Sequence, residues 1–213
     1  MAERYPGYDV LAKRTTPSWN AQTRRVVDQR LAVPREPRFF TADEFRTLDA
    51  IAARITPQPA HRPPIPVAAL IDDKLMRGRH DGYRAAEMPR EPEAWQRGLR
   101  AIDAEAEALH GAAFHALDGA RQDAVLQRVE AGEAHHQAWR GIPPATFFKQ
   151  RLLPDIVHAY WSHPTAWSEI GWGGPASPRG YVRMGYDRRD PWEAVEAHDG
   201  DGARARRDNR HVG

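Results

Sequence analysis

Between residues 39 and 163, apolar side chains recur at intervals of three and four, the spacing of one buried face of an α-helix. The first such face comprises Phe45, Leu48, Ala52 and Ile55. Thr41 and Glu44 together match a capping box, so we expect a helix to begin directly after Thr41. Thr56 and Pro57 should end it, because proline cannot continue the hydrogen-bond ladder.

Four more helices are expected in the same region. The second follows Pro66 and should stop at Gly78. The third starts near Pro92 and has an apolar face of Trp95, Leu99, Ile102, Ala106 and Leu109. Asp118 is a typical N-cap for the fourth, which Gly132 would end. The fifth begins after Pro143-Pro144, and Pro154 should kink or divide it.

The two ends of the chain lack this period. Residues 1–38 are rich in proline and predict an extended N-terminal arm with at most one helix near 20–32. Residues 164–197 are rich in glycine, proline and aromatic side chains, a composition typical of a structured loop that wraps a domain. Residues 198–213 are almost all charged or small, so we expect a disordered tail.

The predicted fold is therefore mainly α, an irregular helical domain of about five helices at 39–163. The N-terminal arm and the Gly/Pro/aromatic-rich C-terminal wrap flank this domain. A chain of 213 residues is long enough for one core with extensions, and too short for two full enzymatic domains. No apolar run approaches the roughly 18 residues of a membrane-spanning helix.

Composition excludes several kinds of chemistry. The chain has no cysteine, which removes disulfides, iron–sulfur clusters, cysteine-bound zinc and covalently attached haem. The formal net charge is +2, and the arginines are spread along the whole chain. A nucleic-acid partner is not expected, because such proteins concentrate basic residues on one face.

We find no sequence motif for catalysis or for cofactor binding. The chain lacks G-x-G-x-x-G, the phosphate loop G-x-x-x-x-G-K-[ST], the zinc motif H-E-x-x-H and the nucleophile motif G-x-S-x-G. His135 and His136 are adjacent, and two other pairs, His110 with His115 and His158 with His163, are five apart; both are poor spacings for shared metal ligation. We therefore expect no catalytic, cofactor-binding or metal-ligating residue. The alternatives are a metal-dependent enzyme using histidines and carboxylates, and an arginine-rich binder of anionic partners.

The order of these segments resembles the gluconate 2-dehydrogenase subunit 3 family over about residues 39–192. The resemblance rests on the succession FFTADEFRTLDAIAARITP, WQRGLRAIDAEA, FHALDGARQDAVL, FFKQRLLPDIVHAYWSHP and a closing GGP…RGY. It implies an accessory subunit that stabilises or matures a large FAD-containing dehydrogenase subunit of the glucose-methanol-choline (GMC) oxidoreductase type. That partner would oxidise a sugar or sugar acid, and in some such complexes a cytochrome c subunit takes the electrons. FAD is thus expected in the partner and no cofactor in this chain.

The aromatic and arginine-rich segment is our hypothesis for the partner interface, because these residue types are enriched at interfaces. The candidate residues are Trp167, Trp172, Arg179, Tyr181, Arg183, Tyr186, Arg188 and Arg189. The alternative is that these aromatic rings simply cover helices of their own domain.

The N-terminal region contains an arginine pair, Arg24-Arg25, of the kind found in twin-arginine export signals. Charged residues follow where such a signal has its apolar stretch, so we expect no export signal here. A cytoplasmic location is therefore the expectation, with co-export to the periplasm alongside a partner as the alternative.

Overall fold

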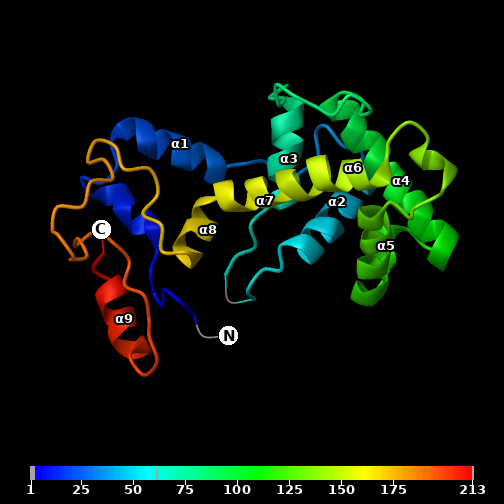
Figure 1. The fold of residues 1–213 in the computed structure, drawn as a ribbon. Coiled ribbons are helices and arrows are strands. Elements are labelled where there is room, and N and C mark those ends of the chain that lie inside the picture. The colour runs from blue at the N-terminus through cyan, green and yellow to red at the C-terminus, as the bar shows by residue number, and fades with distance from the viewer. Residues whose placement is uncertain (1–2, 61, 213) are drawn as a thin grey trace. The chain divides into compact units, whose positions relative to one another are not determined.

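The computed structural model describes residues 3–60 and 62–212 (Figure 1). Helices make up 54% of the structure, and no β-strand occurs among the described residues, which confirms the mainly α fold. The chain divides into two compact units. One unit is Pro34–Tyr160, here called the helical unit. The other combines Met1–Val33 with Trp161–Gly213 and is here called the terminal unit.

The helical unit contains the five predicted helices. They are α2 (Ala42–Ile55), α3 (Val67–Met76), α4 (Glu91–His110), α5 (Gly119–Ala131) and a last helix in three parts, α6 (Pro144–Phe147), a π-helical turn (Phe148–Leu152) and α7 (Leu153–Ser162). The capping box is confirmed, since Glu44 N donates to Thr41 Oγ1 at 3.2 Å and Thr41 N to Glu44 Oε2 at 2.9 Å. Asp118 caps α5, and Gly132 ends it in the left-handed conformation.

Helix α4 carries much of the core of the helical unit. Its buried face includes Trp95, Leu99, Ile102 and Ala106, as predicted, whereas Leu109 in the last turn is exposed. The rings of Phe40 and Phe147 pack edge-on against Trp95, with centroids 6.2 and 6.0 Å away. A Cβ on Gly98 would lie within 2.6 Å of three atoms of the Phe147 ring, so α6 contacts the backbone of α4 itself.

Pro154 divides the last helix as predicted, and the structure shows how. The backbone widens into the π-helical turn at Phe148–Leu152 directly before the proline. Pro154 has no amide hydrogen to donate to the carbonyl of Gln150, and a wider turn gives its ring room without ending the helix. The helix continues through α7 as a result.

A buried carboxylate holds the chain in place before α2. Asp72 of α3 is 1% exposed and accepts hydrogen bonds from the backbone amides of Arg38, Phe39 and Phe40 at 2.9 to 3.0 Å. Three amide donors compensate for the loss of water around this charge. Asp72 therefore holds residues 38–40, which lead into α2, against α3.

The terminal unit is built from both ends of the chain, which lie side by side within it (Figure 1). It contains the 3-10 helix η1 (Val10–Thr15), α1 (Ala21–Leu31), α8 (Pro164–Glu169) and α9 (Gly202–Asn209). Its core consists of Tyr8, Val10, Trp19, Val27, Trp167 and Val212. The N-terminal arm and the C-terminal wrap, which we expected as separate segments, thus share one hydrophobic core.

Two expectations for the C-terminal part need correction. The predicted loop at 164–197 begins with a short helix, α8, and the tail predicted to be disordered contains α9. Asn209 explains the ordered tail, because its buried side chain donates to the carbonyls of Pro6 and Val195 and accepts from the amide of Val195. The polar composition of the tail therefore gave no indication that Asn209 joins three segments of the chain.

No helix in the described part of the chain is long and apolar enough to cross a membrane.

We predict that Gly98→Ala destabilises the helical unit by about 1–3 kcal/mol, the usual cost of overpacking a core. The new methyl group would collide with the Phe147 ring, and this outweighs the roughly 1 kcal/mol that alanine adds to helix propensity. Urea unfolding of the full chain measures the difference. Gly202→Ala is the control, since no atom lies within 4 Å of its Cβ position. A Gly98→Ala protein as stable as the parent would contradict the prediction.

Candidate functional site

The densest group of charged side chains lies inside the helical unit, where four parts of the chain meet. Lys74 comes from α3, Glu91 from the start of α4, Arg151 from the π-helical turn and Asp155 from α7. Asp81 joins them from the segment between α3 and α4. Glu91, Arg151 and Asp155 are buried. We call these five residues the ionic cluster.

Each cation of the ionic cluster contacts all three carboxylates. Lys74 Nζ lies 2.7 Å from Glu91, 3.2 Å from Asp81 and 3.8 Å from Asp155. Arg151 lies 2.6 Å from Asp81, 3.2 Å from Asp155 and 3.3 Å from Glu91. Buried charges are tolerated when they are paired in this way. The cluster therefore joins α3, α4 and the last helix.

Burial and pairing act in opposite directions on the carboxylates. Burial raises the pKa of Asp155 above its usual value, although Arg151, Lys74 and a 3.1 Å hydrogen bond from the Trp95 indole favour its ionised form. Burial also acts to raise the pKa of Asp81, but hydrogen bonds from Arg151 and Lys74 hold it below its usual value. The two carboxylates thus differ in acidity because one is more deeply buried.

The three carboxylates are close enough to share a metal ion, with ligand atoms within 4.8 Å of one another. Lys74 and Arg151 already approach the oxygen atoms that a metal would use, and their charges compensate those of the acids. This arrangement is typical of a structural ion-pair network. It gives no support to the alternative of a metal-dependent enzyme.

The eight predicted interface residues all lie in the terminal unit, in two different environments. Trp167 is buried in the core of the unit, donates from its indole to the carbonyl of Trp161 at 2.8 Å, and has the guanidinium of Arg30 over its ring. It therefore packs against its own unit, as in the alternative interpretation. Trp172 lies edge-on against it, with centroids 4.8 Å apart, and is partly exposed.

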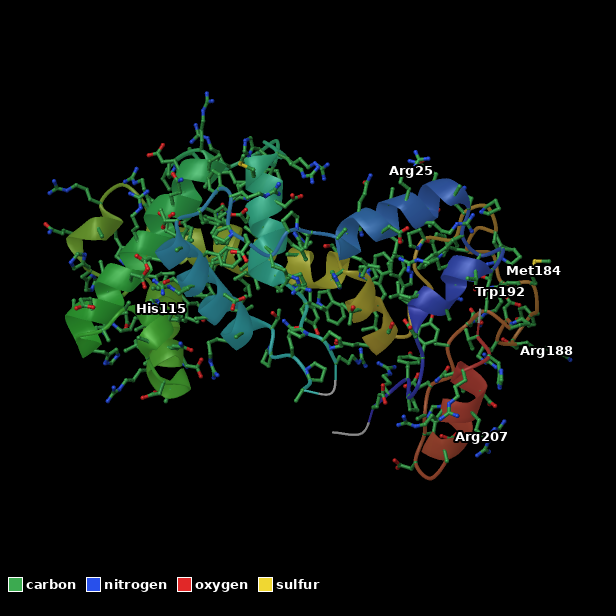
Figure 2. The ribbon with its side chains drawn as sticks, turned by 180° about the vertical axis from the view of Figure 1, so that it is seen from behind. Arg25, His115, Met184, Arg188, Trp192 and Arg207 are labelled. Carbon is green, nitrogen blue, oxygen red and sulfur yellow. The ribbon has the colours of Figure 1, made fainter. Side chains whose placement is uncertain are left out.

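Most of the other predicted residues lie near the surface of the C-terminal segment. Arg183 pairs with Glu193 at 3.0 Å, and Arg189 donates to the backbone carbonyl of Glu193. Arg179 lies over the ring of Trp192 at 4.4 Å. Arg188 points outward at the edge of the segment (Figure 2).

Four apolar or aromatic side chains project from residues 181–186. Tyr181, Val182, Met184 and Tyr186 are between 70% and 94% exposed. Figure 2 shows Met184 at the outer edge of the segment. We call these four residues the exposed strip. Sequence reasoning named the two tyrosines and missed Val182 and Met184, although their alternation with Arg183 and Gly185 was a readable signal.

Lys13 is a further residue that sequence reasoning missed. It lies in η1, is fully buried, and donates from Nζ to the carbonyl of Trp192. Burial lowers the pKa of Lys13 to about 8, and the positive charge of Arg179 adds to the effect. One buried ammonium group thus joins the two ends of the chain inside the terminal unit.

Comparison with known families gives one match, to the family described as gluconate 2-dehydrogenase subunit 3, over residues 42–174. The chain belongs to this family. The matched region begins with α2, contains the ionic cluster and ends at Gly174. The exposed strip and both ends of the terminal unit lie outside it.

The family is that of an accessory subunit of a dehydrogenase complex, in agreement with the resemblance seen in the sequence. No curated protein and no solved structure matches this chain. The family match therefore covers most of the helical unit and α8, and the exposed strip lies beyond its last residue.

We predict that Arg151→Met destabilises the helical unit by about 3–5 kcal/mol, because it leaves three clustered carboxylates with only Lys74 to compensate them. Thermal or urea unfolding measures this loss. Arg46→Met is the matched control, since Arg46 pairs with Asp43 on the exposed side of α2 and should cost less than about 1 kcal/mol. Equal effects of the two substitutions would show that the ionic cluster does not stabilise the fold.

Stability of the terminal unit should rise with pH between about 8 and 10. Folded Lys13 loses its proton near pH 8, whereas unfolded lysine loses it near 10.5, so deprotonation favours the folded state in this interval. Urea unfolding at several pH values checks the slope. Lys13→Met should abolish it, and Lys149→Met, at an exposed position of the helical unit, should preserve it. A slope unchanged by Lys13→Met would refute the assignment.

Proposed function

We propose that this chain is a non-catalytic accessory subunit that binds and stabilises a large FAD-containing dehydrogenase subunit of the GMC type. The family gives the class of complex. The five grouped charges of the ionic cluster compensate one another and join helices, so they supply no free acid, base or nucleophile. Catalysis and FAD are accordingly assigned to the partner, and a cytochrome c subunit is a second proposed partner.

The family match carries the class of complex, and the exposed strip is the observation that supports a binding surface. Two tyrosines, a valine and a methionine are exposed to solvent on one short segment of the terminal unit, more fully than any other large hydrophobic side chain described in that unit. Contiguous exposed apolar side chains commonly mark protein interaction sites. Tyrosine, methionine and arginine are also residue types enriched in interfaces, and exposed Arg188 follows the strip two residues later in the sequence. We infer that the partner covers this strip.

The proposal is tested by capturing the partner from the native host with the tagged full-length chain. We expect to capture a protein that has the absorption spectrum of a flavin. Mass spectrometry should identify it as a GMC-type dehydrogenase. Capture of no flavoprotein would overturn the proposed function. Dehydrogenase activity should appear in the complex and be absent from this chain alone.

The role of the strip needs its own variant. We expect the double substitution Met184→Ser and Tyr186→Ser to reduce capture of the flavoprotein at least about tenfold, equivalent to about 1.4 kcal/mol of binding free energy. The matched control is Met76→Ser with Tyr83→Ser in the helical unit, where the side chains are 53% and 80% exposed. Undiminished capture by the strip variant would place the interface elsewhere while leaving the accessory function intact.

A further inference from the structure

A cavity of about 440 Å³ opens in the terminal unit, between the glycine-rich turn at 171–174 and the segment at 179–196. Four aromatic side chains line it, Tyr5, Trp172, Tyr181 and Trp192. Cavities of this size with aromatic walls and a few polar groups are typical of small-molecule sites. The cavity is separate from the ionic cluster and mostly outside the family-matched region.

The carboxylates that line the cavity are engaged with neighbouring groups of the protein. Glu193 pairs with Arg183 and accepts from the amide of Asp190 at 2.7 Å. Asp190 is buried and accepts from the amide of Met184 at 2.9 Å, and Glu196 pairs with Arg4 at 2.7 Å. These acids stabilise the walls of the cavity.

Arg179 differs from the other arginines of the cavity. Its guanidinium lies over Trp192, and no carboxylate among the described residues forms an ion pair with it. Its Nε is buried and donates to no partner. Buried polar donors in folded proteins are usually hydrogen-bonded, and an unpartnered one costs free energy. Because Arg179 lines the cavity, a ligand bound there could accept hydrogen bonds from the guanidinium nitrogens that face it.

The surroundings of Arg179 favour an anion over a neutral acceptor. Buried Lys13 has its pKa lowered, first by burial and then by the positive charge of Arg179, whose effect is larger than the opposing effect of Glu193. The N–H donors of a guanidinium lie in its own plane, so a guanidinium stacked on an indole can still bind a carboxylate through two parallel hydrogen bonds. The aromatic walls suit a planar, apolar body on that carboxylate.

We propose that this cavity binds a small aromatic carboxylate, whose carboxylate accepts hydrogen bonds from Arg179 and whose ring lies among Tyr5, Trp172 and Tyr181. Recognition then combines a bidentate ion pair between Arg179 and the carboxylate with packing of the ligand ring against aromatic side chains. The site is a property of this chain alone, because every residue that lines it belongs to the terminal unit. It does not depend on the dehydrogenase partner.

The test is isothermal titration calorimetry of the purified full-length chain with benzoate, with benzamide and inorganic phosphate as comparison probes. Saturable binding of benzoate at one site, at least about tenfold tighter than either comparison probe, is expected. Benzamide keeps the ring and lacks the charge, and phosphate keeps the charge and lacks the ring. Absence of saturable benzoate binding, or equal binding of either comparison probe, would overturn the proposal.

Variants locate the site on the protein. Arg179→Gln should weaken benzoate binding at least about tenfold, and Arg179→Lys should weaken it less, because lysine keeps the charge but loses the planar fork. Arg188→Gln is the matched control on the same segment, since Arg188 does not line the cavity. The unfolding midpoint of each variant shows whether it is folded. Undiminished binding by folded Arg179→Gln would place any carboxylate site elsewhere.

Discussion

The close approach of Phe147 to Gly98 determines how the last helix lies in the helical unit. With no side chain at Gly98, the phenyl ring rests on the backbone of α4 and beside Trp95. The π-helical turn follows immediately and carries Arg151, and the first turn of α7 carries Asp155. Arg151 therefore reaches both Asp155 and Glu91, which lies at the beginning of the same α4. Aromatic packing on a glycine thus positions the ionic cluster.

In the terminal unit, side-chain packing and hydrogen bonds hold together two chain ends that contain little regular secondary structure. Trp19 and Trp167 bring one large aromatic side chain from each end into a shared core. Hydrogen bonds then join the ends, from Val10 N to Ser168 Oγ at 3.1 Å and from Ala197 N to the carbonyl of Arg4 at 2.8 Å. With the ends fixed, residues 181–186 can expose apolar side chains without loss of the fold.

The two units also divide the functional interpretation. The helical unit contains most of the segment that matches the family, and the charges of its ionic cluster pair with one another and join helices. The terminal unit holds the exposed strip and the cavity beside Arg179. The charges that join helices and the surfaces that we propose for binding thus lie in different units of the chain.

The sequence predicted those parts of the fold that depend on neighbouring residues. Thr41 with Glu44, Asp118, Gly132 and Pro154 act through hydrogen bonds or steric clashes within a few residues, so each is readable from its local context. Aromatic composition was less informative. Trp167 and Tyr186 belong to the same aromatic-rich segment, yet one fills a core and the other stands almost wholly in water.

By itself, then, the sequence determined the five helices of the helical unit, where they begin and end, and the family. Only the tertiary structure decided that Lys13 lies against Trp192, that Asn209 orders the tail, and that charges from residues 74 to 155 form one cluster. The physical reason is the range of the interactions. Caps and proline effects act along the chain, whereas ion pairs and core packing join residues that become neighbours only after the chain has folded.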